Sequence, residues 1–296
     1  MRLGLHLMDF TWPGGPSALA PTLDRILRDA EAAGLHSFWP MDHFFQIGVV
    51  GPPEQPMPEV YATLAWAAAR TTNLQLGALV TGVHYRHPGV LVKSVTTLDV
   101  LSGGRAWLGI GAGWNEEESR GLGIPFPPLA ERFERLDETL QIARRMFDGD
   151  SSPFEGRHYT LERPLNEPSP VRRPPVMVGG SGEQKTMRLV AKYADACNLF
   201  EWRQEPEGLK RKLDVLRRRC DEVGRPYDDV VRTTTGRLRD LDLDAARRRL
   251  DQLAEWGVDL ALLTPPSPLP DGVFEYVAEL VRHAAPLGRP SPALLG

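Results

Sequence analysis

An aspartate and a histidine stand side by side among aromatic residues, directly after an apolar stretch of the chain. The segment reads Trp39-Pro40-Met41-Asp42-His43-Phe44. Histidine exchanges protons near neutral pH and a neighbouring carboxylate can tune it, so Asp42 and His43 could form an acid/base pair beside a flat ring. The alternative is a surface loop in which the two residues are neighbours by chance.

Two glycine-rich segments could hold a ligand against bare backbone. Gly109-Ile110-Gly111-Ala112-Gly113-Trp114 lacks the last glycine of a dinucleotide fingerprint, because position 114 is a tryptophan. Gly179-Gly180-Ser181-Gly182 precedes a helical pattern, where free N–H groups suit a phosphate. It is not a Walker-type loop, because Gln184 stands where that loop needs a glycine. The alternative is an ordinary helix start with Ser181 as its cap.

A third pair of glycines, Gly77 and Gly82, brackets the end of an apolar segment. Such glycines indicate either a strand bulge that approaches a ligand or an ordinary turn. Taken together, the residues predict a flat, phosphate-bearing ligand that lies against glycine backbone near an Asp-His pair. They do not specify a reaction.

The elements that would position these residues alternate between strand and helix along the whole chain. We expect strands over 3–8, 35–41, 74–80, 106–110, 175–178, 195–199, 229–235 and 258–263. We expect helices over 19–33, 59–70, 88–102, 131–148, 183–193, 206–223, 243–256 and 271–285. This alternation predicts an α/β protein with parallel strands, a (β/α)8 TIM barrel, whose site lies in the loops after the strands. An open doubly wound sheet is the alternative.

The barrel is expected to occupy residues 1–296 as a single domain, with 150–173 as an insertion after the fourth β/α unit. Hydrophobic residues make up 42% of the 296 residues and charged residues 25%, which is ordinary for a soluble enzyme. The net charge of −4 gives no reason to expect nucleic acid as a partner. Cys197 and Cys220 have no metal-site or disulfide spacing, so we predict no metal. With no leader and no run of 18 apolar residues, we expect a cytoplasmic protein without a membrane partner.

The sequence resembles the luciferase-like monooxygenase superfamily, and in particular its branch of oxidoreductases that depend on the deazaflavin coenzyme F420. The resemblance covers almost the whole chain and is an ordered series of short matches. The matching segments are Met41-Asp42-His43-Phe44, Tyr85-Arg86-His87-Pro88, Gly111-Ala112-Gly113-Trp114-Asn115-Glu116-Glu117-Glu118, Gly123-Ile124-Pro125-Phe126-Pro127-Pro128, Glu131-Arg132-Phe133, Phe154-Glu155-Gly156-Arg157-His158-Tyr159, and Val178-Gly179-Gly180-Ser181-Gly182-Glu183 with Thr186.

The resemblance implies a cofactor ring at the C-terminal mouth of the barrel. A non-prolyl cis peptide on the third strand, here Leu79–Val80, would cradle the ring, and Gly111, Ala112 and Gly113 would leave room for it. The cofactor phosphate would be held by Gly179, Gly180, Ser181 and Gly182. His43 would be the catalytic acid/base, held in place by the second catalytic residue, Asp42.

The same resemblance implies hydride transfer between F420 and a small organic molecule. We expect Trp39, Phe44 and Trp114 to form the substrate pocket and exclude water. Sugar-phosphate dehydrogenases of the family carry a glutamate where this chain has Trp114, so we expect a more apolar or aromatic substrate. An FMN-dependent monooxygenase and a non-catalytic flavin-binding barrel are the alternatives. Family members often dimerise, so a homodimer is possible.

Overall fold

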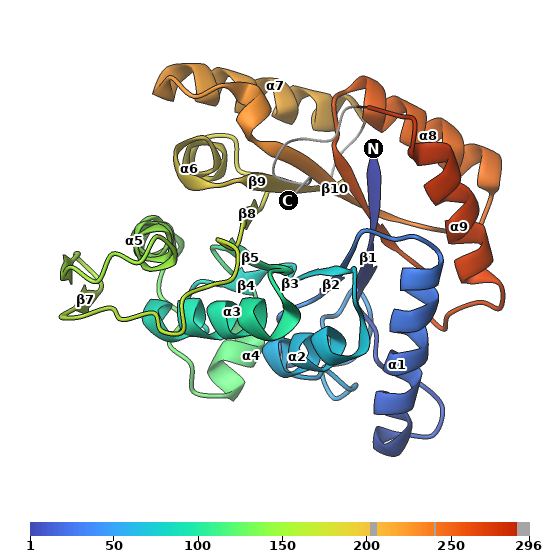
Figure 1. Cartoon of the computed structure of the whole chain (residues 1–296), viewed down its shortest axis with the longest axis horizontal. Helices are drawn as coiled ribbons and strands as arrows, with labels where there is room; N and C mark the ends of the chain where they lie inside the picture. The colour runs from blue at the N-terminus through green and yellow to red at the C-terminus, as the bar shows by residue number, and fades with distance from the viewer. Residues whose placement is uncertain (202–205, 240, 289–296) are drawn as a thin grey trace.

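The main strands close into a parallel barrel, shown in Figure 1 with helices around it. The computed structural model describes residues 1–201, 206–239 and 241–288. The hydrogen-bonded strand order is β3-β2-β1-β11-β10-β9-β8-β5-β4, and an additional pairing of β3 with β5 closes the sheet on itself. This closure confirms the predicted (β/α)8 barrel and excludes an open doubly wound sheet. The barrel strands are β1 (Arg2–Leu7), β2 (Ser37–Pro40), β3 (Gln75–Gly77), β4 (Thr81–Gly82), β5 (Ala106–Gly111), β8 (Val176–Gly179), β9 (Ala196–Phe200), β10 (Val231–Arg237) and β11 (Leu260–Thr264).

The outer layer consists of helices that follow the strands along the chain. All eight expected helices are present: α1 (Pro16–Ala32), α2 (Val60–Arg70), α3 (Pro88–Ser102), α5 (Leu129–Phe147), α6 (Lys185–Tyr193), α7 (Pro206–Val223), α8 (Leu243–Glu255) and α9 (Val273–Ala284). Their ends follow local sequence signals. Helix α3 begins with Pro88 at its first turn and ends at Gly103, which takes the left-handed conformation at φ 68°.

Four small elements escaped the sequence analysis. They are the short helix α4 (Glu116–Gly121), the hairpin of β6 (Phe154–Glu155) and β7 (Thr160–Leu161), the 3-10 turn η2 (Tyr227–Asp229), and β4. The hairpin lies within the expected insertion at 150–173. Strand β4 exists because the expected strand over 74–80 is interrupted after Gly77 and resumes at Thr81. Of these elements, α4 and the interruption before β4 both contribute to the site described below.

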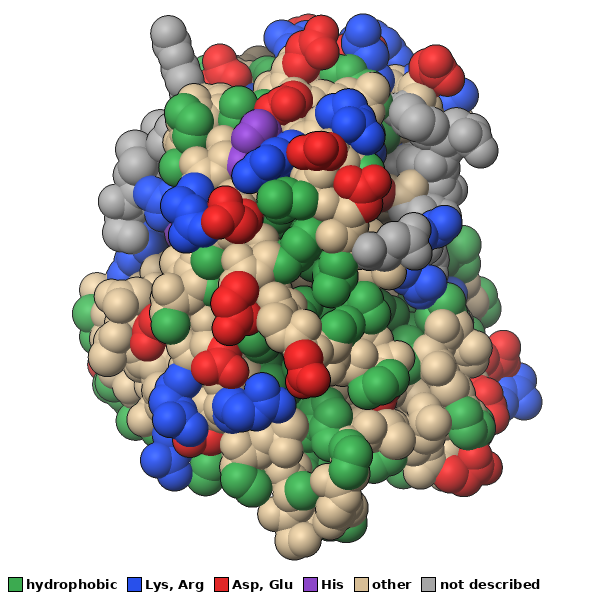
Figure 2. Space-filling view, turned by 90° about the vertical axis from the view of Figure 1, so that its right-hand side faces the viewer, with side chains coloured by type: hydrophobic (Ala, Val, Ile, Leu, Met, Phe, Trp, Pro, Cys, Tyr) green, Lys and Arg blue, Asp and Glu red, His purple; other side chains and the backbone are tan. Residues whose placement is uncertain are grey.

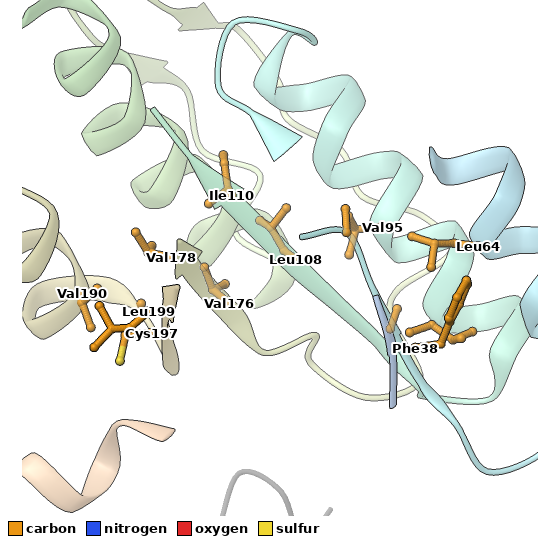
Figure 3. Packing of buried hydrophobic residues seen from close by; sticks show 14 of the residues in the cluster. Phe38, Leu64, Val95, Leu108, Ile110, Val176, Val178, Val190, Cys197 and Leu199 are labelled. Carbon is orange, nitrogen blue, oxygen red and sulfur yellow. The ribbon is translucent and has the colours of Figure 1, made fainter. Parts of the chain in front are cut away.

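The core lies mainly between the barrel and its helices. Side chains of successive strand residues point to opposite faces, so alternate residues of one strand face the helices. Figure 3 shows Leu108 and Ile110 of β5 with Val176 and Val178 of β8 in this layer. Phe38 of β2 packs in the same layer, beside Leu64 of α2 and Val95 of α3. The cluster is fully buried and fixes the directions in which the strands end.

A second, smaller apolar cluster fills the barrel interior. Its members are Trp39, Leu79, Trp107, Met177, Ala196, Val231, Leu260 and Leu262. Trp39 and Trp107 pack edge to face with ring centroids 5.7 Å apart, and the indole of Trp39 donates to Ser37 Oγ at 2.8 Å. Position 77 requires a glycine, because a Cβ there would occupy the space of the Trp39 ring. The two tryptophans therefore close the barrel interior below the mouth.

The surface carries charges of both signs. On the face formed by α1, α8 and α9, acidic and basic side chains alternate with apolar ones (Figure 2). In the ranges that the structure describes, no helix combines the length and the apolar character that crossing a membrane requires.

Candidate functional site

A cavity of about 480 Å³ opens at the C-terminal ends of the barrel strands. Its wall contains eleven residues predicted from the sequence: His43, Leu79, Val80, Gly111, Ala112, Gly113, Trp114, Gly179, Gly180, Ser181 and Gly182. Six further apolar side chains, from the segments after β1 and β2 and from the start of α5, add to the lining: Met8, Met41, Ile47, Val49, Leu129 and Phe133. The cavity is therefore apolar on one side and bounded by bare backbone on the other.

The backbone wall consists of strand ends packed against the interruption of the third strand. The Leu79–Val80 peptide bond is cis, as the family resemblance implies. A Cβ on Gly179 would lie 2.9 Å from the Val80 side chain, and one on Gly111 would lie 3.1 Å from the Gly179 carbonyl oxygen. Side chains at these two positions would disturb the contact between the strands. The result is a smooth surface on which a planar ring can lie.

The glycine-rich turn after β8 forms one end of the cavity. It leads into α6, and the buried side chain of Thr186 in the first turn also lines the cavity. Lys212 of α7 donates to the Ser181 carbonyl oxygen at 2.7 Å and so fixes the turn. The cap residue of α6 is Gln184, which makes no side-chain cap bond, so the alternative of Ser181 as an ordinary cap is wrong. A turn of this kind presents free N–H groups to an anion.

His43 is held by a glutamate that comes from α4. The Nδ1 atom of His43 lies 2.6 Å from Oε1 of Glu118, whose side chain is completely buried. The other carboxylate oxygen accepts from the backbone N–H groups of Phe44 at 2.6 Å and Phe45 at 3.2 Å. One carboxylate thus positions both the imidazole and the loop that carries it.

Glu118 is ionised in this setting. Burial by itself would raise the pKa of Glu118, but the hydrogen bonds from His43, Tyr85 and the Phe44 amide outweigh burial and lower it. Burial and the hydrogen bond to Glu118 raise the pKa of Tyr85. Its hydroxyl therefore stays protonated and donates a hydrogen bond to the carboxylate. Because a carboxylate has no proton to give, Nδ1 of His43 is the donor, and Nε2 is the nitrogen left for proton exchange.

Asp42 has a different role from the one expected. Both of its carboxylate oxygens accept from the guanidinium of Arg86, at 2.6 and 3.1 Å, and Arg86 also pairs with Glu59. The prediction that Asp42 holds His43 is therefore wrong. Successive residues of an extended segment point in opposite directions, so Asp42 faces the outer loops while His43 faces the cavity. Among the described residues, Asp42 is not part of the cavity wall.

Two of the three aromatic residues expected in the substrate pocket lie elsewhere. Trp39 is fully buried in the barrel interior, and Phe44 packs on Tyr85 with ring centroids 5.1 Å apart. Neither belongs to the described lining of the cavity, so these two predictions are wrong. Trp114 does line it: the ring meets His43 edge to face at 5.4 Å and remains 53% exposed at the rim.

The sequence analysis missed Glu118, Tyr85 and Thr186 as site residues. All three stand inside segments that carry the family resemblance, which was the available signal. Glu118 is the third of three consecutive glutamates, and a short helix presents only one of them to the barrel. Without α4, nothing in the sequence separates the buried glutamate from its two exposed neighbours.

These residues fit a phosphorylated, ring-bearing cofactor such as F420 or FMN. A planar ring matches the wall of Val80, Gly111 and Gly179, which side chains would obstruct. A phosphate matches the turn from Gly180 to Gly182 and the Thr186 hydroxyl. In the described part of the chain, no group of three or more His, Cys, Asp or Glu side chains is arranged to hold a metal ion.

Comparison with known proteins gives a consistent assignment of fold and family. The sequence model described as luciferase-like monooxygenase matches residues 1–288. An F420-dependent glucose-6-phosphate dehydrogenase from Kineococcus radiotolerans is 34% identical over 209 residues, which are 69% of this chain and 59% of that protein. The aligned region thus spans little more than half of this relative's length.

Two solved structures share the fold along nearly the whole chain. An F420-dependent secondary alcohol dehydrogenase in complex with an F420-acetone adduct superposes with a TM-score of 0.79 at 16% identity, covering 96% of this chain and 98% of that one. A riboflavin lyase with modified FMN and riboflavin superposes with a TM-score of 0.80 at 14% identity, covering 98% and 93%. At these identities, the similarity concerns the fold alone.

Proposed function

The chain belongs to the luciferase-like monooxygenase family, and we propose that it is an oxidoreductase that transfers a hydride between coenzyme F420 and an apolar organic molecule. The observation that carries this proposal is the pairing of His43 with the buried Glu118 at the edge of a glycine-walled cavity. It supports the proposal because His43, as a group that exchanges protons, would then act beside a surface that suits a planar ring.

F420 is favoured as the cofactor by the relatives, and the lining of the cavity accommodates it. The K. radiotolerans relative is named as F420-dependent, and so is one of the two structural neighbours. When bound, F420 supplies a ring carbon that accepts or gives up a hydride. The residues that would hold it are Leu79, Val80, Gly111, Ala112 and Gly113 for the ring, and the turn from Gly179 to Gly182 with Thr186 for the phosphate.

His43 would take up or release the proton that accompanies the hydride. Nδ1 donates to Glu118, so the proton moves through Nε2. Glu118 keeps the ring in one tautomer and stabilises the imidazolium that forms when Nε2 is protonated, as a buried carboxylate does for a catalytic histidine. In this scheme, Glu118 is a positioning residue.

The rim of the cavity favours a substrate with apolar or aromatic groups. Trp114, Leu129 and Val49 are each more than half exposed, and all three line the cavity. The name of the K. radiotolerans relative assigns it to glucose 6-phosphate. We propose a different substrate class here, because a sugar has many hydroxyl groups, and the aliphatic side chains of Leu129 and Val49 cannot bind them.

The second candidate is an FMN-dependent monooxygenase. It is supported by the family name and by the riboflavin lyase, whose structure contains a modified FMN. The backbone wall and the phosphate turn accommodate either ring system, so the lining alone does not separate the two cofactors.

Cofactor binding is the experiment that separates them. The purified protein is titrated with oxidised F420 and, separately, with FMN, and binding is followed by fluorescence quenching. We expect F420 to bind at least about 10-fold more tightly than FMN, a difference of about 1.4 kcal/mol. Preference for FMN, together with oxygen consumption in the presence of reduced flavin, would move the protein to the monooxygenase branch. Binding of neither would contradict the proposal.

A further inference from the structure

Two of the six residues of α4, Glu118 and Ser119, are buried. Glu116, Glu117 and Arg120 of the same helix are exposed. A helix of six residues is not stable by itself, so the contacts of its buried side chains must hold it in place. The direction in which Glu118 points therefore depends on these contacts.

Two consecutive residues after β4 hold the two buried side chains. The hydroxyl of Tyr85 donates to Glu118. The imidazole of His84 lies beside Ser119, with its Nε2 atom 2.9 Å from the hydroxyl oxygen. The Ser119 hydroxyl donates its one proton to the backbone carbonyl of Asn115 at 3.0 Å. The Ser119 oxygen therefore accepts from His84, and Nε2 of His84 carries the proton.

The surroundings of His84 favour the same tautomer. Its Nδ1 atom is buried and has no hydrogen-bond partner among the described residues, so the other tautomer would leave a buried N–H group without an acceptor. Burial, followed by the charge of Arg132, lowers the pKa of His84 to about 4, so the ring is uncharged near neutral pH. A neutral donor leaves the negative charge of Glu118 to His43.

The ring of His84 lies between the cavity wall and α4. It packs on Tyr85 with ring centroids 4.4 Å apart and on Phe126 with centroids 5.1 Å apart. A Cβ on Gly113, which lines the cavity, would collide with the same ring, so the backbone of the wall lies against it. These contacts fix the place from which His84 reaches Ser119.

We propose that His84 is a positioning residue of the site: its hydrogen bond to Ser119 sets the orientation of α4 and so directs Glu118 to Nδ1 of His43. His84 is not among the described residues that line the cavity, so it acts through Glu118 rather than on a ligand. The inference rests on the proposed function, in which His43 handles the proton that accompanies the hydride.

The test measures how firmly His43 holds the proton on Nδ1. The full chain is prepared without cofactor and with isotope-labelled histidine, and the exchange of this proton with water is followed by NMR. His84→Phe keeps a ring that packs on Phe126 and removes the donor, while Ser119→Ala removes the acceptor. We expect each change to speed the exchange about 5-fold or more, the equivalent of one lost hydrogen bond. His84→Gln, whose amide nitrogen can replace Nε2, should keep the rate close to that of the wild type.

Two comparisons separate this role from a general loss of structure. The double variant His84→Phe/Ser119→Ala should exchange no faster than either single variant, because both changes remove the same hydrogen bond. His283→Phe, which removes a hydrogen bond to Asp251 outside the site, should leave the exchange rate unchanged. An unchanged rate in Ser119→Ala, or additive effects in the double variant, would overturn the proposal. Ser119→Ala removes a single oxygen atom, so it decides the question even if His84→Phe does not fold.

The role of His84 and the cofactor assignment can fail separately. The exchange is measured without cofactor, so faster exchange in the variants supports the role of His84 even if F420 does not bind and the proposed function falls. If F420 binds and the variants exchange at the wild-type rate, His84 has no positioning role and the proposed function stands.

Discussion

Nδ1 of His43 lies 2.6 Å from Oε1 of Glu118, although the two residues are 75 positions apart in the chain. The loop after β2 supplies the histidine and α4, which follows β5, supplies the carboxylate. The pair exists only because the barrel brings the ends of these strands to the same mouth.

Replacing Glu118 by Gln removes the charge that holds His43 in its tautomer. We expect kcat to fall at least about 10-fold while the Kd for F420 changes little, because the carboxylate acts through the histidine. His43→Ala should lower kcat further, by about 10² or more, again with cofactor binding retained. Glu117→Gln is the matched control, an exposed glutamate on the same short helix. Loss of cofactor binding in Glu118→Gln would instead mark a purely structural contact.

Replacing Asp42 by Asn tests the corrected role of this residue. The change leaves the largely buried guanidinium of Arg86 with Glu59 as its remaining carboxylate partner. Breaking a buried pair by removing one partner typically costs about 3–5 kcal/mol, and Glu59 offsets part of that cost. We expect the free energy of unfolding in urea to fall by about 2 kcal/mol or more. Asp29→Asn, which breaks the exposed pair with Arg25, should change it by less than about 1 kcal/mol. If both variants lower the free energy of unfolding equally, the ion pair of Asp42 and Arg86 contributes no more to stability than an exposed pair.

Adding a methyl group at Gly111 tests the ring surface. The new Cβ would lie 3.1 Å from both the Val80 side chain and the Gly179 carbonyl oxygen, within the wall of the cavity. We expect Gly111→Ala to raise the Kd for F420 about 10-fold, since the wall must shift to accept the methyl group. Gly48→Ala adds the same methyl group to open space and serves as the control. An unchanged Kd in Gly111→Ala would place the ring elsewhere.

Thr186 tests the phosphate end of the cavity. Its side chain is buried in the first turn of α6 and lines the cavity beside Gly182. A hydrogen bond to a charged group contributes about 1.5–3 kcal/mol, so Thr186→Val should raise the Kd for F420 by about 10-fold or more. Thr97→Val makes the same substitution on the exposed side of α3 and should leave the Kd for F420 unchanged. The prediction fails if the two variants bind F420 equally well.

His6 is buried, and burial, followed by the charge of Arg237, lowers the pKa of its ring, which makes stability depend on pH. Its folded pKa of about 3 lies below the ordinary value of 6.5, so between these values the unfolded chain binds a proton that the folded chain does not. The free energy of unfolding should therefore fall as the pH drops below 6.5, with a contribution of about 1.4 kcal/mol per pH unit. Urea unfolding of the wild type and of His6→Asn between pH 6.5 and 5 measures this slope. An equally steep slope in the variant would assign it to other groups.

The fold followed from the sequence because it depends on repeated patterns. Each strand and each long helix has its own apolar period, and eight repetitions outweigh errors at single boundaries. The placement of Leu79–Val80 and of the segment from Gly111 to Gly113 followed from the family resemblance. The directions in which single side chains point could not be predicted from the sequence. Trp39 and Asp42 precede His43 by only a few residues, yet one faces the barrel interior and the other faces Arg86.

Contacts between residues that are distant in the sequence could not be predicted either. Glu118 has the sequence environment of a solvated glutamate, and only the six-residue helix α4 turns it inward. An isolated helix of that length is not stable, so its existence depends on tertiary contacts that no local pattern records.

The edge-to-face tryptophans below the cavity have a kinetic consequence. Because Trp39 and Trp107 fill the barrel interior, we expect no exit from the cavity through the described part of the barrel, and the mouth is then the route by which ligands enter and leave. A ligand that binds deeper in the cavity must enter before, and leave after, a ligand that binds nearer the mouth. We therefore expect a compulsory order of addition, in which a substrate analogue traps the cofactor and slows its dissociation.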